Sequence, residues 1–271
     1  MPKQKVTPEL KQEIINFYLS EPMTLKQVEN KYNLSHPTVS KILKNIPKYS
    51  KAKIYNPNLK EHFFKKLNEI SAYYLGLIIA DGNVYNSQDG RQSSISITLQ
   101  EEDEYLLIKF KEILNANTSV SHDGRGSSQF AIRSNIMAEE LKTYGVIPRK
   151  SFFTYLPQIE DILMPHLIRG IFDGDGSIQA KINKDNRYLH SFSFCGTHKL
   201  MQDIADYLNK NLVLTQKINV YDYKNRELSE IKIQNKHDMF IFGEWIYNNS
   251  SIYMKRKYNE YLNFKQHYNF K

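Results

Sequence analysis

The sequence has one cysteine, Cys195, so an internal disulfide framework is excluded. No apolar stretch reaches the roughly 18 residues that a membrane-spanning helix needs, and the first residues lack the apolar core of a secretion signal. No group of Cys and His has the spacing of a zinc site. These absences predict a cytoplasmic protein. Few Gly beside many Lys, Asn, Ile and Tyr suggest an AT-rich genome, bacterial or phage.

The positive charge is concentrated at one end of the chain. Residues 1–60 contain 11 Lys and 4 acidic residues, whereas residues 61–271 contain 26 basic and 25 acidic residues. A small basic unit on a near-neutral body suits a polyanion, because Lys and Arg that neutralise phosphates release counterions. The same charge is equally compatible with a solvated, solubilising surface.

Residues 7–44 have the pattern of three short helices. Thr7, Thr24 and Ser35 each precede an amphipathic stretch and suit the N-cap position. Asn33 suits the left-handed turn that ends the second helix. Two short helices joined by a tight turn, the second led by small polar residues, form the plan of a helix-turn-helix.

This stretch resembles the helix-turn-helix modules of resolvases and transposases. In such modules the second helix of the pair enters the major groove of DNA. The resemblance makes the polar residues of that helix candidate contacts to bases and phosphates: Ser35, His36, Thr38, Ser40 and Lys41. A small three-helix protein-contact domain is the alternative.

The rest of the chain contains an internal repeat. YYLGLIIADGNVY (73–85) and LIRGIFDGDGSIQ (167–179) are both apolar segments that contain Asp-Gly, and the two Asp-Gly pairs are 94 positions apart. Each copy is followed by an alternating strand, a helix and a further strand that leads into another helix. An in-register repeat of this length predicts two similar subdomains related by a pseudo-twofold axis.

Both copies resemble the LAGLIDADG motif, as YLGLIIADG (74–82) and IRGIFDGDG (168–176). The flanking VIPRKS (146–151) and YMKRKY (253–258) are similar as well. The chain is thus similar, over about 63–271, to two-motif, single-chain LAGLIDADG homing endonucleases. The resemblance implies an α+β fold of two pseudo-symmetric αββαββα subdomains that form a DNA-binding saddle, preceded by a small all-α helix-turn-helix domain. The expected domains are a helix-turn-helix module (1–48), a basic linker (49–62) and two LAGLIDADG subdomains (63–158 and 159–271).

Small residues recur four apart in each motif. This spacing lets two helix backbones approach closely, by analogy with membrane helices. The residues concerned are Gly76 and Ala80 in the first copy and Gly170 and Gly174 in the second.

Asp81 and Asp175 are then expected at the C-termini of adjacent helices, with Gly82 and Gly176 as left-handed C-caps. A carboxylate at a helix C-terminus opposes the helix dipole by about 0.3–1 kcal/mol, and two neighbouring carboxylates repel each other. A divalent cation reverses both penalties, and Mg²⁺ prefers a few carboxylates plus phosphate oxygens. We therefore expect Asp81, Asp175 and the backbones of Gly82 and Gly176 to hold Mg²⁺, with Mn²⁺ able to substitute. Two ordinary Asp-Gly turns are the alternative.

The resemblance implies four further catalytic residues. Lys150 and Lys257 stand where the family places basic residues that stabilise developing phosphate charge. Asp103 and His198 follow the second strand of each repeat, where polar residues help to position water. The alternatives are surface or helix-end lysines, and for His198 an ordinary helix N-terminus. Asp173 is interpreted as a supporting residue and not as a metal ligand.

Alternation along the strands predicts which side chains face DNA. The expected face is rich in amide, hydroxyl and cationic groups, which read base edges, although a plain solvated sheet would have a similar composition. Its members are Asn83, Tyr85, Ser94, Ser96, Thr98, Gln129 and Arg133 in the first repeat, and Ser177, Gln179, Lys181, Ser191, Ser193, Lys217, Asn219, Tyr221, Lys232 and Gln234 in the second.

The resemblance therefore implies a site-specific homing endonuclease that hydrolyses both strands of a long duplex DNA and, as in the family, leaves short 3′ overhangs. Because the two repeats differ, we expect an asymmetric target and a monomeric protein. The alternatives on the same fold are a group I intron RNA maturase, with intron RNA as partner, and a DNA-binding regulator. Intact Asp81 and Asp175 favour cleavage, although a maturase can retain both.

Overall fold

The computed structural model describes residues 6–46, 56–87, 92–148, 155–224 and 227–270. The chain divides into two compact units, one made of residues 1–60 and 114–118 and the other of residues 61–113 and 119–271. No described helix is both long and apolar enough to cross a membrane.

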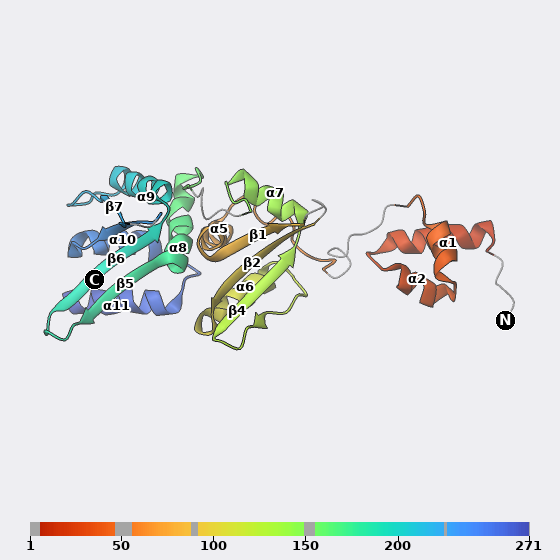
Figure 1. The fold of residues 1–271 in the computed structure, drawn as a ribbon, viewed down its shortest axis with the longest axis horizontal. Coiled ribbons are helices and arrows are strands. Elements are labelled where there is room, and N and C mark those ends of the chain that lie inside the picture. Colours follow the sequence, from red (N-terminus) through yellow and green to blue (C-terminus); the bar gives the residue numbers. More distant parts are fainter. Residues whose placement is uncertain (1–5, 47–55, 88–91, 149–154, 225–226, 271) are drawn as a thin grey trace. The chain divides into compact units, whose positions relative to one another are not determined.

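The first unit contains the three helices that the sequence predicts, α1 (Pro8–Ser20), α2 (Leu25–Tyr32) and α3 (His36–Ile42), at the red end of the chain in Figure 1. Thr7 caps α1, and Thr24 forms a capping box with Gln27 at the start of α2. Asn33 ends α2 with φ 51°, in the left-handed region. Ser35 makes no capping hydrogen bond, and its hydroxyl instead lies 2.9 Å from that of Thr38.

The helices of this unit enclose a small core of their own. Because the apolar residues of each helix lie on one face, they meet in a single cluster. Its buried members are Ile14, Tyr18, Met23, Val28, Val39 and Leu43.

The first half of the second unit is α5 (Glu69–Asp81), β1 (Gly82–Asn86), β2 (Ser93–Gln100), α6 (Glu104–Ile113), β3 (Ser121–His122), β4 (Ser127–Arg133) and α7 (Asn135–Thr143). A short 3₁₀ turn, Glu101–Asp103, precedes α6. The antiparallel strands form one sheet in the order β1-β2-β4-β3.

The second half repeats this order as α8 (Met164–Asp175), β5 (Gly176–Ile182), β6 (Tyr188–Gly196), α9 (His198–Asn211), β7 (Val220–Asp222), β8 (Ser229–Ile233) and α10 (Lys236–Tyr247), and then adds α11 (Lys255–Tyr268). Its sheet has the equivalent order β5-β6-β8-β7. The registers also correspond, because Gly82 pairs with Ile97 and Gly176 with Phe194. These findings confirm the predicted α+β fold with two pseudo-symmetric halves.

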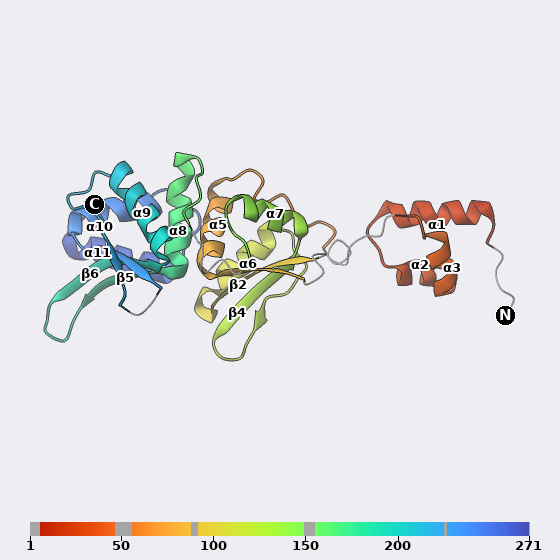
Figure 2. The ribbon, with the colours of Figure 1, turned by 45° about the horizontal axis from the view of Figure 1, so that its top comes forward.

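The alternation of the strands sorts their side chains as predicted. Figure 2 shows α5 and α7 above the strands of the first sheet and α8 and α9 above those of the second. The apolar strand residues are turned toward the helices: Val84, Ile95, Ile97, Phe130, Ile132, Phe192, Phe194, Ile231 and Ile233 are buried. Ile178 and Val220 were expected in the same layer and are only half-buried.

Helices α5 and α8 lie side by side where the two halves meet (Figures 1 and 2). Their backbones touch at two glycines. A Cβ atom added to Gly76 would lie 2.1 Å from the carbonyl oxygen of Leu167, and one added to Gly170 would lie 2.0 Å from that of Tyr73. A Cβ atom on Gly174 would lie 2.3 Å from that of Ala80. The close approach predicted from the spacing of small residues is therefore confirmed.

The prediction of left-handed C-caps at Gly82 and Gly176 is wrong. Their φ angles are −86° and −89°, so both residues are extended. Each helix passes directly into a strand, and this requires extended backbone at the junction. Glycine is needed there for space: a Cβ atom on Gly82 would lie 2.6 Å from the backbone of Ile78, and one on Gly176 would lie 2.2 Å from the ring of Phe172.

Replacing Gly76 or Gly170 by Ala should destabilise the second unit, because the new methyl group would meet a rigid carbonyl of the facing helix. Overpacking of this kind typically costs about 1–3 kcal/mol. We expect thermal unfolding to show a fall of several degrees in Tm for each variant. Gly196→Ala is the matched control, since its nearest neighbour is the flexible end of Met201 at 3.1 Å. Equal Tm values for all three variants would contradict backbone contact between α5 and α8.

Candidate active site

The two motif aspartates lie together at the ends of α5 and α8. Asp81 is the last residue of α5 and Asp175 the last of α8. A Cβ atom on Gly174 would lie 2.9 Å from Oδ2 of Asp81, so the Asp81 carboxylate is positioned across the interface, against the residue that precedes Asp175. Asp81 is half-buried and Asp175 is exposed. The glycine contact between the helices thus places two carboxylates at one edge of the second unit.

Lys257, near the start of α11, closes the end of α8. Its ammonium group donates to the carbonyl oxygens of Phe172 at 2.7 Å, Asp173 at 2.7 Å and Gly176 at 2.5 Å. Carbonyls at the end of a helix have no partner within the helix, and a buried cation can satisfy them while opposing the negative end of the dipole. Lys257 is only 4% exposed.

The ammonium group of Lys257 interacts electrostatically with both motif aspartates. Burial lowers the pKa of its ammonium group to about 8, while Asp173, Asp81 and Asp175 act in the opposite direction. Lys257 therefore lies at the predicted site. Because its ammonium group is occupied by carbonyls, its predicted contact with a phosphate stays a prediction. Lys150, its predicted counterpart, lies outside the described residues.

Asp173 is fully buried and makes hydrogen bonds to two segments that pack beside the site. Its Oδ2 accepts hydrogen bonds from the Tyr73 hydroxyl at 2.8 Å and from the backbone N–H of Met254 at 2.7 Å. Burial raises the pKa of its carboxyl to about 6, and Lys257 is the largest opposing influence. Since Met254 caps α11, this contact fixes the start of the helix that carries Lys257. The supporting role expected for Asp173 fits these contacts.

Asp103 and His198 occupy different environments. Asp103 is 2% exposed and accepts from Nε of Arg256 at 2.8 Å. His198 is exposed, and its Nδ1 lies 2.7 Å from Asp222 Oδ1. By the strand registers His198 corresponds to Glu101 of the first half and not to Asp103. The 3₁₀ turn Glu101–Asp103 makes α6 start three residues later than α9. Their predicted role in positioning water is not tested by these contacts.

The predicted DNA-reading residues form one polar face of each sheet. Most are exposed or half-buried, opposite the apolar residues that meet the helices. Ser191 is the exception, being 6% exposed. It lies in the central strand β6, where its short side chain is flanked by strands on both sides.

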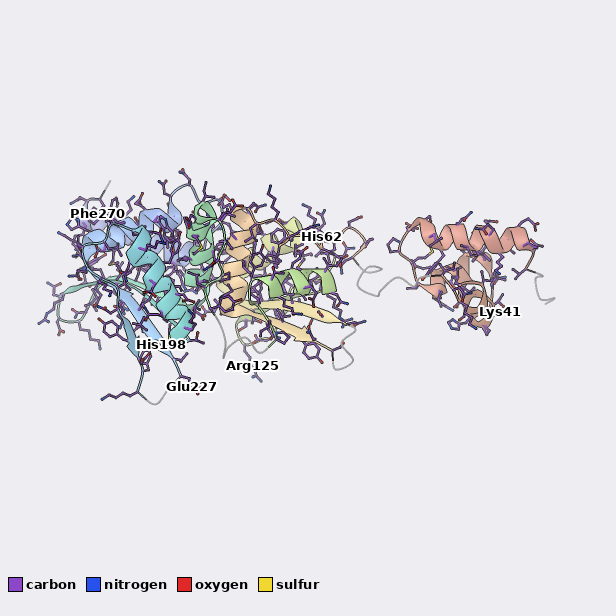
Figure 3. The ribbon with its side chains drawn as sticks, turned by 90° about the horizontal axis from the view of Figure 1, so that it is seen from above. Lys41, His62, Arg125, His198, Glu227 and Phe270 are labelled. Carbon is purple, nitrogen blue, oxygen red and sulfur yellow. The ribbon has the colours of Figure 1, made fainter. Side chains whose placement is uncertain are left out.

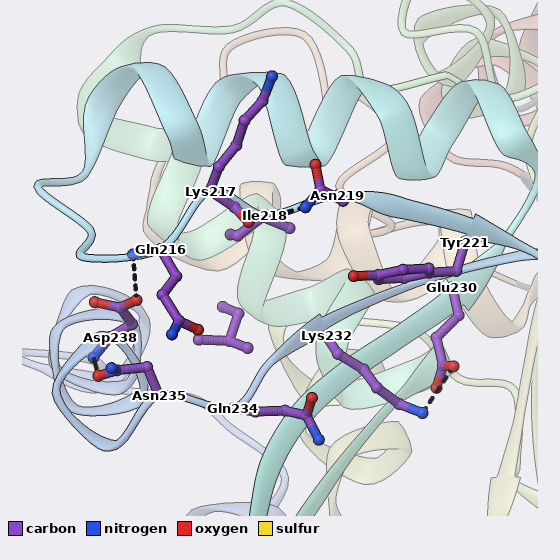
Figure 4. Close-up of a pocket in the computed structure, with 11 residues that line it drawn as sticks. Gln216, Lys217, Ile218, Asn219, Tyr221, Glu230, Lys232, Gln234, Asn235 and Asp238 are labelled. Carbon is purple, nitrogen blue, oxygen red and sulfur yellow. Dashed lines mark hydrogen bonds and ion pairs between the residues drawn. The ribbon is translucent and has the colours of Figure 1, made fainter.

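A polar concavity at the edge of the second sheet gathers five of these residues (Figure 4): Lys217, Asn219, Tyr221, Lys232 and Gln234. The concavity also includes Glu230, whose Oε2 lies 2.9 Å from Nζ of Lys232. Sequence reasoning missed Glu230, although alternation places it on the same face as Lys232. Sequence reasoning left Glu230 out because it is negatively charged, and anionic groups are not expected to face DNA phosphates.

In the first unit the candidate contacts lie on α3 and its N-terminus. Lys41 is exposed there and is labelled in Figure 3. His36 Nδ1 lies 2.6 Å from Oε1 of Glu29 on α2, so this ring is held by the preceding helix. The hydroxyl groups of Ser35 and Thr38 are hydrogen-bonded to each other. Ser40 is half-buried.

The donor set at the two aspartates fits an oxygen-preferring divalent cation. Two carboxylates stand beside backbone carbonyls, and Mg²⁺ usually takes one or two carboxylates and completes its shell with water and phosphate oxygens. The carbonyl of Gly176 already accepts from Lys257 but has a second lone pair. Among the described residues no group of three or more His, Cys, Asp or Glu could form an all-protein metal cage.

The two sheets, the paired motif helices and the carboxylates at their ends define a class of fold: the chain has the fold of the LAGLIDADG homing endonucleases. It is similar to I-AabMI bound to uncleaved DNA, with a TM-score of 0.54 and 16% identity over 75% of this chain and 91% of that chain. I-GzeII in complex with its DNA target gives a TM-score of 0.54 and 14% identity over 74% and 89%. I-SmaMI bound to uncleaveable DNA gives 0.54 and 16% over 74% and 90%. No protein-family model and no curated protein matches the sequence.

The raised pKa of Asp173 predicts a specific dependence of stability on pH. Its carboxyl has a pKa of about 6 in the fold against an ordinary 3.8, so ionisation costs stability as the pH rises through that interval. Because one pKa unit corresponds to about 1.4 kcal/mol, the wild type should become less stable by about 3 kcal/mol relative to Asp173→Asn between about pH 4 and pH 7. Denaturant unfolding of both proteins across this range measures the difference. Asp206→Asn, on the exposed side of α9, is the control. If the free-energy difference between the wild type and Asp173→Asn does not change with pH, Asp173 does not titrate in this range.

Proposed function

We propose that the protein is a site-specific DNA endonuclease that hydrolyses both strands of a long, asymmetric duplex in a reaction that depends on Mg²⁺. The observation that carries this proposal is the meeting of Asp81 and Asp175 at the ends of two helices in backbone contact. The similar structures support it, because I-AabMI, I-GzeII and I-SmaMI are each seen bound to DNA.

In this proposal Asp81 and Asp175 hold the cation between the two halves of the protein. Bound Mg²⁺ supplies Lewis-acid activation of water and stabilisation of the leaving oxygen. Lys257 keeps the end of α8 in place and adds positive charge beside the carboxylates. Lys150, Asp103 and His198 keep the roles of stabilising phosphate charge and orienting water that the family resemblance implies.

The polar faces of the two sheets are the proposed base-reading surfaces. Exposed amides, hydroxyls and cations at alternate strand positions can reach base edges in the major groove. Arg133 on β4 and Gln179 on β5 are examples, and both are exposed. Since equivalent positions of the two sheets carry different residues, one chain would recognise an asymmetric site as a monomer.

The first unit is the proposed accessory DNA-binding module. Its three helices have the helix-turn-helix plan, and residues 1–60 hold a clear excess of Lys over acidic residues. In this arrangement α3 enters the major groove, whereas most of the following basic segment lies outside the described residues. The module would lengthen the recognised site.

Replacing either motif aspartate should separate binding from cleavage. Asp81→Asn and Asp175→Asn each remove a ligand charge while preserving shape, so we expect cleavage in Mg²⁺ to fall by at least ~10²-fold. Binding in Ca²⁺, measured by fluorescence anisotropy on a duplex selected from a randomised library, should stay largely unchanged. Asp206→Asn, an exposed acid on α9, is the matched control. Full cleavage by either variant would contradict metal binding by that aspartate. Binding without cleavage by the wild type would indicate a maturase or a regulator.

Deleting residues 1–48 should weaken DNA binding without removing cleavage. If the module neutralises phosphates, the dependence of log K on log salt should become shallower by about 0.9 for each phosphate that the module neutralises. Lys41→Gln in the full chain should produce a small part of the same change. Lys26→Gln is its control, because Lys26 lies 3.6 Å from Glu29 and is already ion-paired. A salt slope that is identical with and without the module would mean that the module does not touch DNA.

A further inference from the structure

An ion pair lies on the polar face of the second sheet. Oε2 of Glu230 is 2.9 Å from Nζ of Lys232, which is two residues further along β8 (Figure 4). The alternate residues Ser229, Ile231 and Ile233 are buried against the helices. Both members of the ion pair therefore face the opposite side of the sheet, which is the side proposed to contact DNA. Their side chains are 15% and 41% exposed, and both line the polar concavity.

The carboxylate of Glu230 is held by two side chains. Lys232 contacts one of its oxygens, and the hydroxyl of Tyr223 donates a hydrogen bond to the carboxylate, which raises the pKa of that hydroxyl. An ionised carboxylate can accept about four hydrogen bonds. The two contacts fix the position of the carboxylate and still leave acceptor capacity for a ligand.

The two acids that line the concavity have different surroundings. Asp238 is 1% exposed, and its carboxylate accepts from the backbone N–H groups of Thr215 and Gln216. Glu230 is instead paired with side chains on an accessible face. An acid on this face would repel DNA phosphates, and an exposed ion pair contributes little to stability. Neither general attraction to DNA nor folding accounts for Glu230 at this position.

The neighbouring strand leaves the ion pair open and places it near the motif aspartates. On β6 the partner of Glu230 is Cys195 and that of Lys232 is Ser193, and both side chains are short. These two rows lie on either side of the row that contains Gly176. With strands about 4.8 Å apart, the ion pair is about 10 Å from the Asp-Gly junction. In the proposed complex it therefore faces bases within a few steps of the cleavage site.

The donor and the acceptor of the ion pair match the major-groove edge of one C·G base pair. Cytosine N4 is a donor, and the neighbouring O6 and N7 of guanine are acceptors. N4 and O6 are joined by a Watson–Crick hydrogen bond and are thus about 2.9 Å apart. This is also the separation of Glu230 Oε2 from Lys232 Nζ. An A·T pair also has a donor beside an acceptor, but a methyl group flanks its O4 acceptor, whereas guanine offers the ammonium group two acceptors.

We propose that Glu230 and Lys232 together read one C·G base pair, with the carboxylate on cytosine N4 and the ammonium group on guanine. This inference rests on the proposed function, and it names one base pair of the DNA that the protein selects. Because the two side chains already hold each other, binding costs less side-chain entropy than it would for two independent residues. Lys232 also offsets the charge that Glu230 would otherwise present to the phosphates.

Exchanging the two residues tests the assignment of donor and acceptor. The double variant Glu230→Lys, Lys232→Glu retains the net charge and an ion pair, but its donor and acceptor have changed places. All four base pairs are compared at each position of a duplex that the full-length protein selects from a randomised library, by competition binding in Ca²⁺. We expect the wild type to prefer C·G about 5- to 100-fold at one position. The double variant should prefer the inverted pair, G·C, at the same position.

A second measurement does not depend on the folding of the double variant. Glu230→Ala removes the acceptor from an exposed face, and a cytosine analogue without the N4 amino group removes the donor. The analogue should weaken binding of the wild type by about 5-fold or more. It should not weaken binding of Glu230→Ala further, because the two changes remove the same hydrogen bond.

The matched control exchanges an ion pair that lies away from the concavity. Glu139→Lys with Lys142→Glu reverses an exposed pair on α7, whose charged atoms are 3.3 Å apart, and should keep the wild-type base preferences. Unchanged preferences in the Glu230→Lys, Lys232→Glu variant, or equal losses with the analogue in the wild type and in Glu230→Ala, would overturn the inference. In either case selection and cleavage of a duplex would leave the proposed function intact. Failure to select any duplex would overturn both.

Discussion

The contact between the backbones of α5 and α8 is the constraint on which the site depends. Gly76 and Gly170 leave no room for a Cβ atom on either side, so the two helix backbones are in direct contact. Their C-termini are consequently held together as well. A wider spacing would move Asp81 away from Asp175, the two carboxylates that share a cation in the proposed function. Packing between the halves and chemistry at the site are thus fixed by the same pair of glycines.

This arrangement accumulates negative charge where a fold alone would avoid it. Two helix dipoles end at the same place, two carboxylates stand on those ends, and Asp173 adds a third acid in the interior. Lys257 offsets part of this charge from within, by binding the last carbonyls of α8. The motif aspartates remain on the outside. In the proposed function this arrangement puts the protein's own cation behind the carboxylates and the metal and phosphate in front of them.

Local rules predicted much of the fold because the residues concerned act locally. Thr24 caps a helix and Asn33 takes the left-handed turn, as their types favour. The same rules failed at Gly82 and Gly176, because only the tertiary path of the chain into β1 and β5 reveals that these glycines are extended spacers. The position of the motif aspartates at the two helix ends was predictable because the repeat marks it twice. The partners of Lys257 were not, since its carbonyl acceptors are distant in sequence and no pattern marks them.

The two halves of the second unit are more alike in backbone structure than in the chemistry of their side chains. At the positions where α8 has Arg169 and Asp173, α5 has Leu75 and Ile79, and all four are buried. The apolar pair needs only packing, whereas the charged pair needs partners that α11 and its preceding segment supply, through the carbonyl of Ile252 and the N–H of Met254. Two identical chains could not provide this difference. A single chain with two unequal halves can place distinct polar groups around one symmetric pair of carboxylates, and this is the arrangement that the proposed asymmetric DNA site requires.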